Sequence, residues 1–184
     1  MIRLSQLSQE KEIYQIKSLQ EDNLKSQLTK EECESEGFLT ASYTVDFLIK
    51  MNELHPAILA KDGDTLAGYA LVASRANKGE HELLDDLISH CERVIYKEQK
   101  LSELPYAIVG QLCVAKKYRG QGLVQKLYQY FKECNQNKFC CCITDVDCQN
   151  PRSLKAHVNS GFEVIGSLGY GGAQWNLVLW NWTL

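Results

Sequence analysis

The sequence predicts a single α/β (α+β) domain with a mixed sheet, and three observations lead to this prediction. Short apolar segments of strand length alternate with segments whose apolar residues recur at helical spacing. The 184 residues suit one domain, 1–184, and no repeat, low-complexity tract or Pro/Gly-rich linker marks a second one. Apolar residues make up 45% of the chain, which is enough for a sizeable core.

The N-terminal third is predicted to be helical. Ile13, Ile16 and Leu19 lie at helical spacing, and a second apolar stripe runs through residues 45–51. Between the two helices the acidic stretch 31–37 interrupts the pattern. We interpret that stretch as a solvated loop that could also attract a cationic amine.

The middle of the chain is predicted to be a hairpin followed by an inserted helix. Residues 55–60 and 66–73 are the expected strands, and Asp62-Gly63-Asp64 forms the turn between them. Residues 80–96 then carry apolar residues on one helical face, with Ile95 as the last of them. This predicts a helical insertion around 77–105.

The C-terminal half alternates between strands and helices. The expected elements are a strand over 106–115, a helix over 122–134, a strand over 139–146, a short helix over 151–160, and strands over 162–167 and 174–183. Gly110 lies inside the first of these strands, where a glycine is typical of a bulge. In the last strand Val178, Trp180 and Trp182 alternate, which predicts one buried face.

Composition excludes several classes of partner and cofactor. A formal net charge of −3 gives no general attraction to nucleic acid. No apolar run approaches the ~20 residues that span a bilayer, and the N-terminus lacks the regions of a signal peptide. We therefore expect a cytoplasmic protein that binds neither nucleic acid nor membrane. The eight cysteines include no C-x-x-C pair, so we expect small buried apolar residues and no metal.

The stretch 114–123 carries the chemistry, because it lies where a predicted strand meets a predicted helix. Gly120 and Gly122 let the backbone approach a ligand closely. The unpaired N–H groups of the first helical turn face outward, with the positive end of the helix dipole behind them. Such a helix start suits a pyrophosphate, and Lys117 and Arg119 add positive charge beside it.

Other nucleotide motifs fit this loop less well. The Walker A pattern G-x-x-x-x-G-K-[ST] is not present. The dinucleotide pattern G-x-G-x-x-G fails at its third glycine, where Gln125 stands. On this loop alone, a plain glycine turn before a surface helix stays open.

The loop resembles the acyl-CoA pyrophosphate-binding signature of the GNAT superfamily, Q/R-x-x-G-x-G/A. Lys117 stands in the first position, which keeps the positive charge, and Gly120 and Gly122 match the glycines. A second block, which runs from Asn150 to Gly161-Phe162, resembles the last conserved block of the family. Asn150 is also a favourable N-cap residue there, followed by a proline at the first helical position.

The resemblance covers residues 109–162 well and the rest of the chain only in general layout. It implies a mostly antiparallel mixed sheet of about six or seven strands flanked by helices. It also implies N-acetyltransferase activity with acetyl-CoA as acyl donor and a small-molecule or protein amine as acceptor, in a monomer or homodimer. The cofactor-binding residues that it implies are Leu112, Cys113, Val114, Lys117, Arg119, Gly120, Gln121, Gly122, Leu123, Asn150 and Ser153.

The resemblance further implies direct attack of a neutral amine on the thioester, with a backbone N–H near Leu112 or Cys113 binding the oxyanion. Many members place a tyrosine four residues before the Gly-Phe pair as the acid for the leaving thiolate. Here that residue is His157, which can donate one N–H.

The general base departs from the family pattern as well. Many members carry a glutamate where this chain has Gln111, which leaves Asp145, Asp147 and His55 as candidates. Because both proton-handling positions differ, a GNAT-fold module that binds acyl-CoA without turnover, as a sensor or partner-binding subunit, stays open. A nucleotide-binding domain unrelated to coenzyme A is the third alternative.

Overall fold

Seven strands form one sheet in the order β1-β2-β3-β6-β7-β9-β8 in the computed structural model, which describes residues 1–183. The strands are β1 (Ile2–Gln6), β2 (Ile58–Asp62), β3 (Thr65–Ala73), β6 (Tyr106–Val114), β7 (Cys141–Asp147), β8 (Glu163–Tyr170) and β9 (Ala173–Asn181). Only β6 and β7 are parallel neighbours, and the other pairs are antiparallel. The prediction of a mixed, mostly antiparallel sheet is confirmed.

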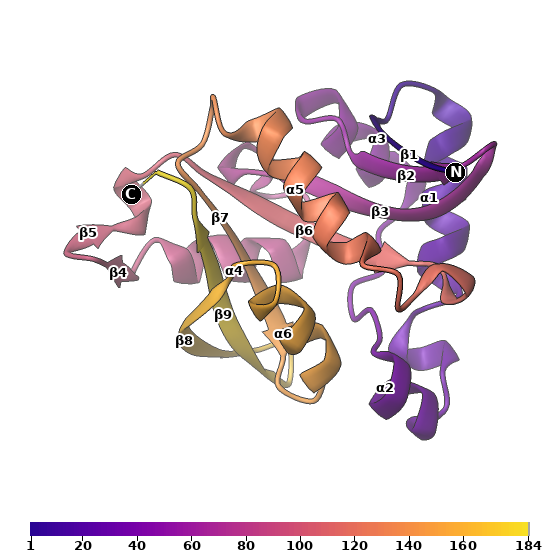
Figure 1. Ribbon diagram of the computed structural model, residues 1–184. Helices are drawn as coiled ribbons and strands as arrows, with labels where there is room; N and C mark the ends of the chain where they lie inside the picture. Colours follow the sequence, from indigo (N-terminus) through magenta and orange to yellow (C-terminus); the bar gives the residue numbers. More distant parts are fainter. Residues whose placement is uncertain (184) are drawn as a thin grey trace.

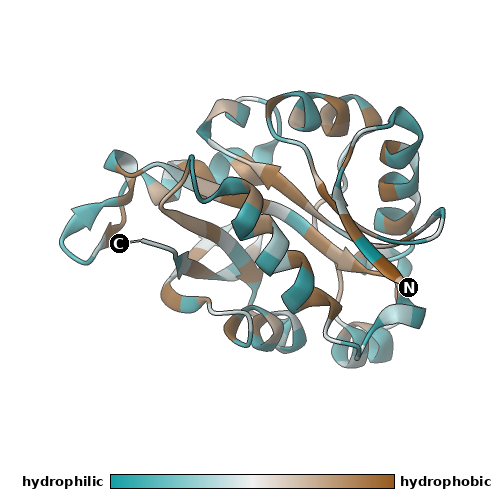
Figure 2. Cartoon of the chain, turned by 45° about the horizontal axis from the view of Figure 1, so that its top comes forward, coloured by the Kyte–Doolittle hydropathy of each residue, from teal (hydrophilic) through white to brown (hydrophobic). Residues whose placement is uncertain are grey.

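Helices cover both faces of this sheet. They are α1 (Glu10–Glu21), α2 (Lys30–Glu36), α3 (Val45–Leu54), α4 (Glu82–Cys91), α5 (Leu123–Asn135) and α6 (Pro151–Val158). Apolar residues of α1, α3 and α4 form a core with one face of the sheet, and those of α5 form a second core with the other. Figure 1 shows α5 in front of the sheet and α3 and α4 behind it. Hydrophobic residues are concentrated on the central strands in Figure 2, because these are buried on both faces.

Two predictions for the N-terminal third were wrong. Residues 2–6 form the edge strand β1, which pairs with β2, although a helix was expected there. The acidic stretch is not a loop but the helix α2. Thr29 accepts a hydrogen bond from the backbone N–H of Glu32, and the Glu32 carboxylate accepts one from the N–H of Thr29. This capping box, with acidic residues in the first turn, stabilises the short helix.

The insertion is shorter in its helical part than the apolar pattern predicts. The helix α4 ends at Cys91, and the chain continues into a small hairpin of β4 (Ile95–Tyr96) and β5 (Gln99–Lys100). Lys97 and Glu98 have positive φ angles of 47° and 67°, as the two central residues of a tight hairpin turn require. Ile95 is consequently 65% exposed rather than part of the apolar face.

The last strand also differs from its prediction. β9 is central in its half of the sheet, between β7 and β8, and both of its faces are covered. Leu177 and Leu179 pack into one core and Val178 into the other. Among residues 1–183, no helix has the length and apolar character needed to cross a membrane.

Candidate active site

The site is organised by the separation of the two parallel strands. β6 and β7 pair only where Tyr106–Ile108 meets Cys141–Ile143, and beyond that point they diverge (Figure 1). A register shift against β3 leaves Gly110 without a partner, which confirms the bulge that the sequence predicts. Because a bulge bends its strand, β6 turns away from β7 there. The facing edges of the two strands then border a cleft.

This cleft has a volume of about 720 Å³. That volume lies within the range of about 300–1,000 Å³ that small-molecule sites occupy. Its walls come from segments far apart in the chain: residues 36–41, α4, β6, the start of α5, the end of β7, α6 and the β8–β9 hairpin. We describe the cleft by two regions, one at the start of α5 and the other beneath α4.

The start of α5 offers hydrogen-bond donors to the cleft. Gly122 is the N-cap in the left-handed conformation with φ 70°, and no side chain of residues 1–183 caps the helix. Within the described residues, no backbone or side-chain acceptor is found for the N–H groups of Leu123, Val124 and Gln125, all of which line the cleft. Gly120 has φ 74° and open space around it. These open N–H groups at a helix start fit a phosphate group.

Nine of the eleven residues that we predict to bind the cofactor line this cleft. They are Leu112, Cys113, Val114, Arg119, Gly120, Gly122, Leu123, Asn150 and Ser153. Lys117 and Gln121 are exposed beside it. The Lys117 ammonium lies 4.7 Å from the centroid of the Tyr118 ring, and the Gln121 side chain donates to the Lys117 carbonyl.

Arg119 is engaged by the protein itself at this end of the cleft. Its Nε–H donates to the Val114 carbonyl over 3.0 Å, and Nη1 pairs with the Glu36 carboxylate over 2.6 Å. Its Nη2 also donates to Asn23. The hydrogen bond from Arg119 lowers the pKa of Glu36 below its ordinary value. The acidic helix α2 is thus held against the basic loop, a contact that sequence reasoning missed.

Asn150 joins α6 to the same segment. Its Oδ1 accepts the N–H of Ser153 over 3.1 Å, which caps α6, and its Nδ2 donates to the Phe38 carbonyl over 3.0 Å. The cap that the sequence predicts is confirmed. The segment after α2 is thereby fixed along the cleft.

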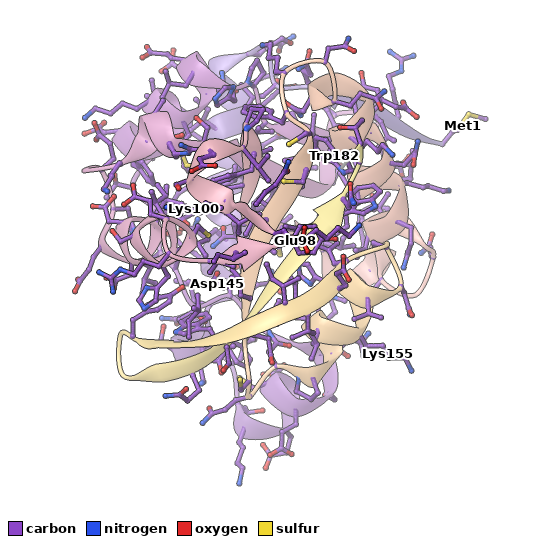
Figure 3. The ribbon with its side chains drawn as sticks, turned by 90° about the vertical axis from the view of Figure 1, so that its left-hand side faces the viewer. Met1, Glu98, Lys100, Asp145, Lys155 and Trp182 are labelled. Atoms are coloured by element: carbon purple, nitrogen blue, oxygen red, sulfur yellow. The ribbon has the colours of Figure 1, made fainter. Side chains whose placement is uncertain are left out.

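The other end of the cleft contains the carboxyl group of Asp145. Burial raises the pKa of Asp145 from 3.8 to about 7. Among residues 1–183, no lysine, arginine or histidine lies within ion-pairing distance of it. Figure 3 shows Asp145 where α4 and the β8–β9 hairpin come together. A carboxyl group with this pKa can exchange a proton near neutral pH.

The walls around Asp145 are mainly apolar and aromatic. α4 contributes Leu83, Leu84 and Leu87, and the β8–β9 hairpin contributes Tyr170 and Trp175. The two aromatic rings are stacked, with centroids 5.3 Å apart. Sequence reasoning placed the apolar residues of α4 on one face of the inserted helix but missed Tyr170 and Trp175, because nothing local in the sequence places the hairpin opposite α4.

His157 lines the cleft, but both of its ring nitrogens are occupied. Nδ1 lies 2.7 Å from the Ser153 carbonyl oxygen, which can only accept, so Nδ1 carries the proton. Nε2 then accepts from the Tyr128 hydroxyl over 2.7 Å. Burial lowers the pKa of His157 to about 4, so the ring is neutral at pH 7. Its role as the acid for the leaving thiolate stays a prediction, and this geometry does not favour it.

Gln111 and Asp147 also line the cleft, but the protein itself engages both side chains, and His55 lies outside the cleft. Gln111 accepts from Tyr69 over 2.6 Å and donates to the Ala41 carbonyl over 2.8 Å, which fixes it as a structural link. Asp147 pairs with Lys25 over 3.4 Å. His55 lies outside the cleft, 3.0 Å from the Ser74 hydroxyl.

Comparisons with known proteins agree with this architecture. The sequence pattern of the acetyltransferase (GNAT) family matches residues 22–162. No curated protein sequence matches the chain significantly. Among solved structures, the ribosomal-protein-S18-alanine N-acetyltransferase from Escherichia coli is 10% identical with a TM-score of 0.65, covering 100% of this chain and 96% of its own.

Two further structures have the same fold. The NatC complex bound to Gag peptide and CoA is 13% identical with a TM-score of 0.66, and 99% of each chain is covered. A putative acetyltransferase from Salmonella typhimurium with acetyl-CoA is 11% identical with a TM-score of 0.65, covering 100% of this chain and 95% of the other. These likenesses show the fold, and the sequence pattern spans most of the chain. The protein therefore belongs to the GNAT family of acetyltransferases.

Proposed function

We propose that this protein is an N-acetyltransferase that moves the acetyl group of acetyl-CoA to a primary amine. One observation carries the proposal: a single cleft connects the open N–H groups at the start of α5 with the half-buried carboxyl group of Asp145. The first end suits the phosphates of coenzyme A, and the second suits an amine.

Near the start of α5, the residues that line the cleft suit acetyl-CoA, the acyl donor. The N–H groups of Leu123 to Gln125 would hold the pyrophosphate, with Gly120 and Gly122 allowing its approach. The edge of β6 after Ile108 has no strand partner on its cleft side, so its backbone groups would bind the pantetheine arm. Bound acetyl-CoA supplies the activated acetyl group as a thioester.

Asp145 would handle the proton of the attacking amine. An acceptor that binds as an ammonium ion would first give one proton to the ionised Asp145 carboxylate, directly or through water. The neutral nitrogen would then attack the thioester carbonyl, and the proton that it loses as the C–S bond breaks would go to the leaving thiolate. The backbone N–H of Leu112 or Cys113 would bind the oxyanion. A thiol has a pKa near about 8.5, so the thiolate leaves without a dedicated acid. This assignment needs no proton from His157.

The experiment combines binding and turnover. Calorimetry with acetyl-CoA should show micromolar affinity, and thiol release with a panel of amines should show turnover. Asp145→Asn should lower kcat by about 10²–10⁴ with little change in acetyl-CoA affinity, because it removes the base and keeps the shape. Glu82→Gln, on the exposed side of α4, is the matched control. Absence of acetyl-CoA binding would overturn the proposal.

A second function rests on the engaged state of Gln111 and His157. A chain that binds acyl-CoA without transferring it would serve as a sensor or partner-binding subunit. It predicts the same calorimetric result with no thiol release on any amine. The unpaired Asp145 favours the enzyme.

A further inference from the structure

We infer that the acceptor is a small primary amine with an apolar carbon skeleton, held with its nitrogen at Asp145 and its skeleton between α4 and the β8–β9 hairpin. The inference rests on the proposed function, and it names the substrate class of the same site. It comes from the charge, the lining and the closure of the end of the cleft beneath α4.

Charge supplies the first argument. Asp145 has no cationic partner among residues 1–183, and the nearby Tyr43 hydroxyl donates to the Gly110 carbonyl over 2.9 Å instead. An ionised carboxylate in such a place is stabilised by one positive charge from a ligand. Asp147 also lines the cleft but pairs with Lys25, so among the described residues of β7 the unpaired Asp145 carboxylate matches a single ammonium group rather than a polyamine.

The lining supplies the second argument. Leu83, Leu84 and Leu87 line this end from α4, opposite the stacked pair Tyr170 and Trp175. Apolar and aromatic walls favour an apolar skeleton through burial, whereas hydroxyl groups of a sugar would be buried without enough partners. Among the described residues of the cleft, the Tyr170 hydroxyl is the one side-chain polar group that is buried without a hydrogen-bond partner.

Closure of the pocket supplies the third argument. The β8–β9 turn packs against α4: a Cβ atom built on Gly171 would lie 3.0 Å from Leu83 Cδ2. His90, on the same helix, lies 5.5 Å from the Tyr170 ring between centroids. This contact covers the end of the cleft beyond Asp145. A short acceptor fits under that cover, and a peptide, which must continue past its first residues, fits less well.

The test compares acceptors of different chemistry on the whole protein with acetyl-CoA. The panel is 2-phenylethylamine, hexylamine, spermidine, glucosamine and a tetrapeptide with a free N-terminus. We expect kcat/KM for 2-phenylethylamine and hexylamine to exceed that of the other three at least tenfold. The highest value for spermidine, glucosamine or the tetrapeptide would overturn the inference and leave the acetyltransferase function intact.

A variant locates the effect. Leu83→Gln places a polar group on the α4 wall, so we expect KM for 2-phenylethylamine to rise about tenfold while KM for acetyl-CoA stays constant. Glu82→Gln, one residue away and exposed, should change neither. Thermal melting of both variants verifies folding. An unchanged KM for 2-phenylethylamine in folded Leu83→Gln would contradict the proposed wall.

If no amine is acetylated, a binding measurement still distinguishes the proposed acetyltransferase function from the proposed amine pocket. Calorimetry of 2-phenylethylamine with the CoA-loaded protein then decides. Binding that is lost in Asp145→Asn would support the inferred pocket while the transfer function fails. No binding of 2-phenylethylamine would overturn the pocket as well.

Discussion

Replacement of Asp145 by asparagine should make the protein more stable above neutral pH. The pKa of this carboxyl group rises from 3.8 to about 7 on folding because the group is buried. A tenfold change in an acid constant corresponds to about 1.4 kcal/mol, so the ionised group costs the folded state about 4 kcal/mol at most. Because the side chain borders the cleft and retains some exposure, we expect about 2–4 kcal/mol.

The sign determines the pH range in which the effect is seen. Below about pH 4 the carboxyl group is neutral in both the folded and the unfolded protein, and it has no effect on stability. As pH rises from 4 to 7 the unfolded chain ionises first, so the wild-type protein loses stability over this range. Asp145→Asn has no such loss, so the difference between the two proteins should grow with pH and level off above pH 7.

Urea unfolding at pH 4.5, 6 and 8 measures this difference. Asp64→Asn, in the exposed β2–β3 turn, is the control and should follow the wild-type protein at each pH. The same carboxyl group should give kcat/KM a limb that rises through pH 7, and Asp145→Asn should lose that limb. A stability difference that does not depend on pH, or an asparagine variant less stable at pH 8, would refute the reasoning.

Three further predictions concern the other residues of the cleft. His157→Phe should lower the free energy of unfolding by about 1–3 kcal/mol, because the buried Tyr128 hydroxyl loses its acceptor. Adding Tyr128→Phe should recover most of this loss. A fall in kcat of more than 100-fold in the double variant would instead support His157 as the acid. Gly120→Val should weaken acetyl-CoA binding at least tenfold in calorimetry, whereas Gly63→Val, with a similar positive φ outside the cleft, should not. Glu36→Gln should tighten acetyl-CoA binding several-fold by removing a negative charge beside the phosphate end, and weaker binding would contradict this.

The elements whose local pattern is strong could be predicted from the sequence. The strand containing Gly110, the glycine turn before α5 and the Asn150 cap of α6 all depend on residues close together in the chain. The strand β1 could not be predicted, because its pairing with β2 joins residues about 55 positions apart. Helix α2 was missed although its capping box, Thr29 and Glu32, is local in the sequence; what could not be predicted is its contact with the site, because Glu36 and Arg119 lie 83 residues apart.

The acceptor end of the cleft could not be predicted from the sequence either, because its walls come from segments far apart in the chain. Its apolar walls come from α4 and from the β8–β9 hairpin, and each wall carries a pattern that also suits an ordinary buried face. Only the sheet order, with β7 beside β9 and β6 beside β3, brings the two walls opposite each other. Local periodicity predicts that such residues are buried but does not predict what they surround.

The unfavourable free energy of ionised Asp145 in the folded protein is itself an argument that this residue is functional. Proteins are marginally stable, so a buried carboxyl group that costs about 2–4 kcal/mol is a large fraction of the usual 5–15 kcal/mol. Such a cost is relieved either by a cation of the protein or by a ligand. Within the described residues no cation pairs with Asp145, and the cleft beside it is open to a ligand. A positively charged acceptor would relieve the cost on binding, so the same carboxyl group that destabilises the free protein would select the amine.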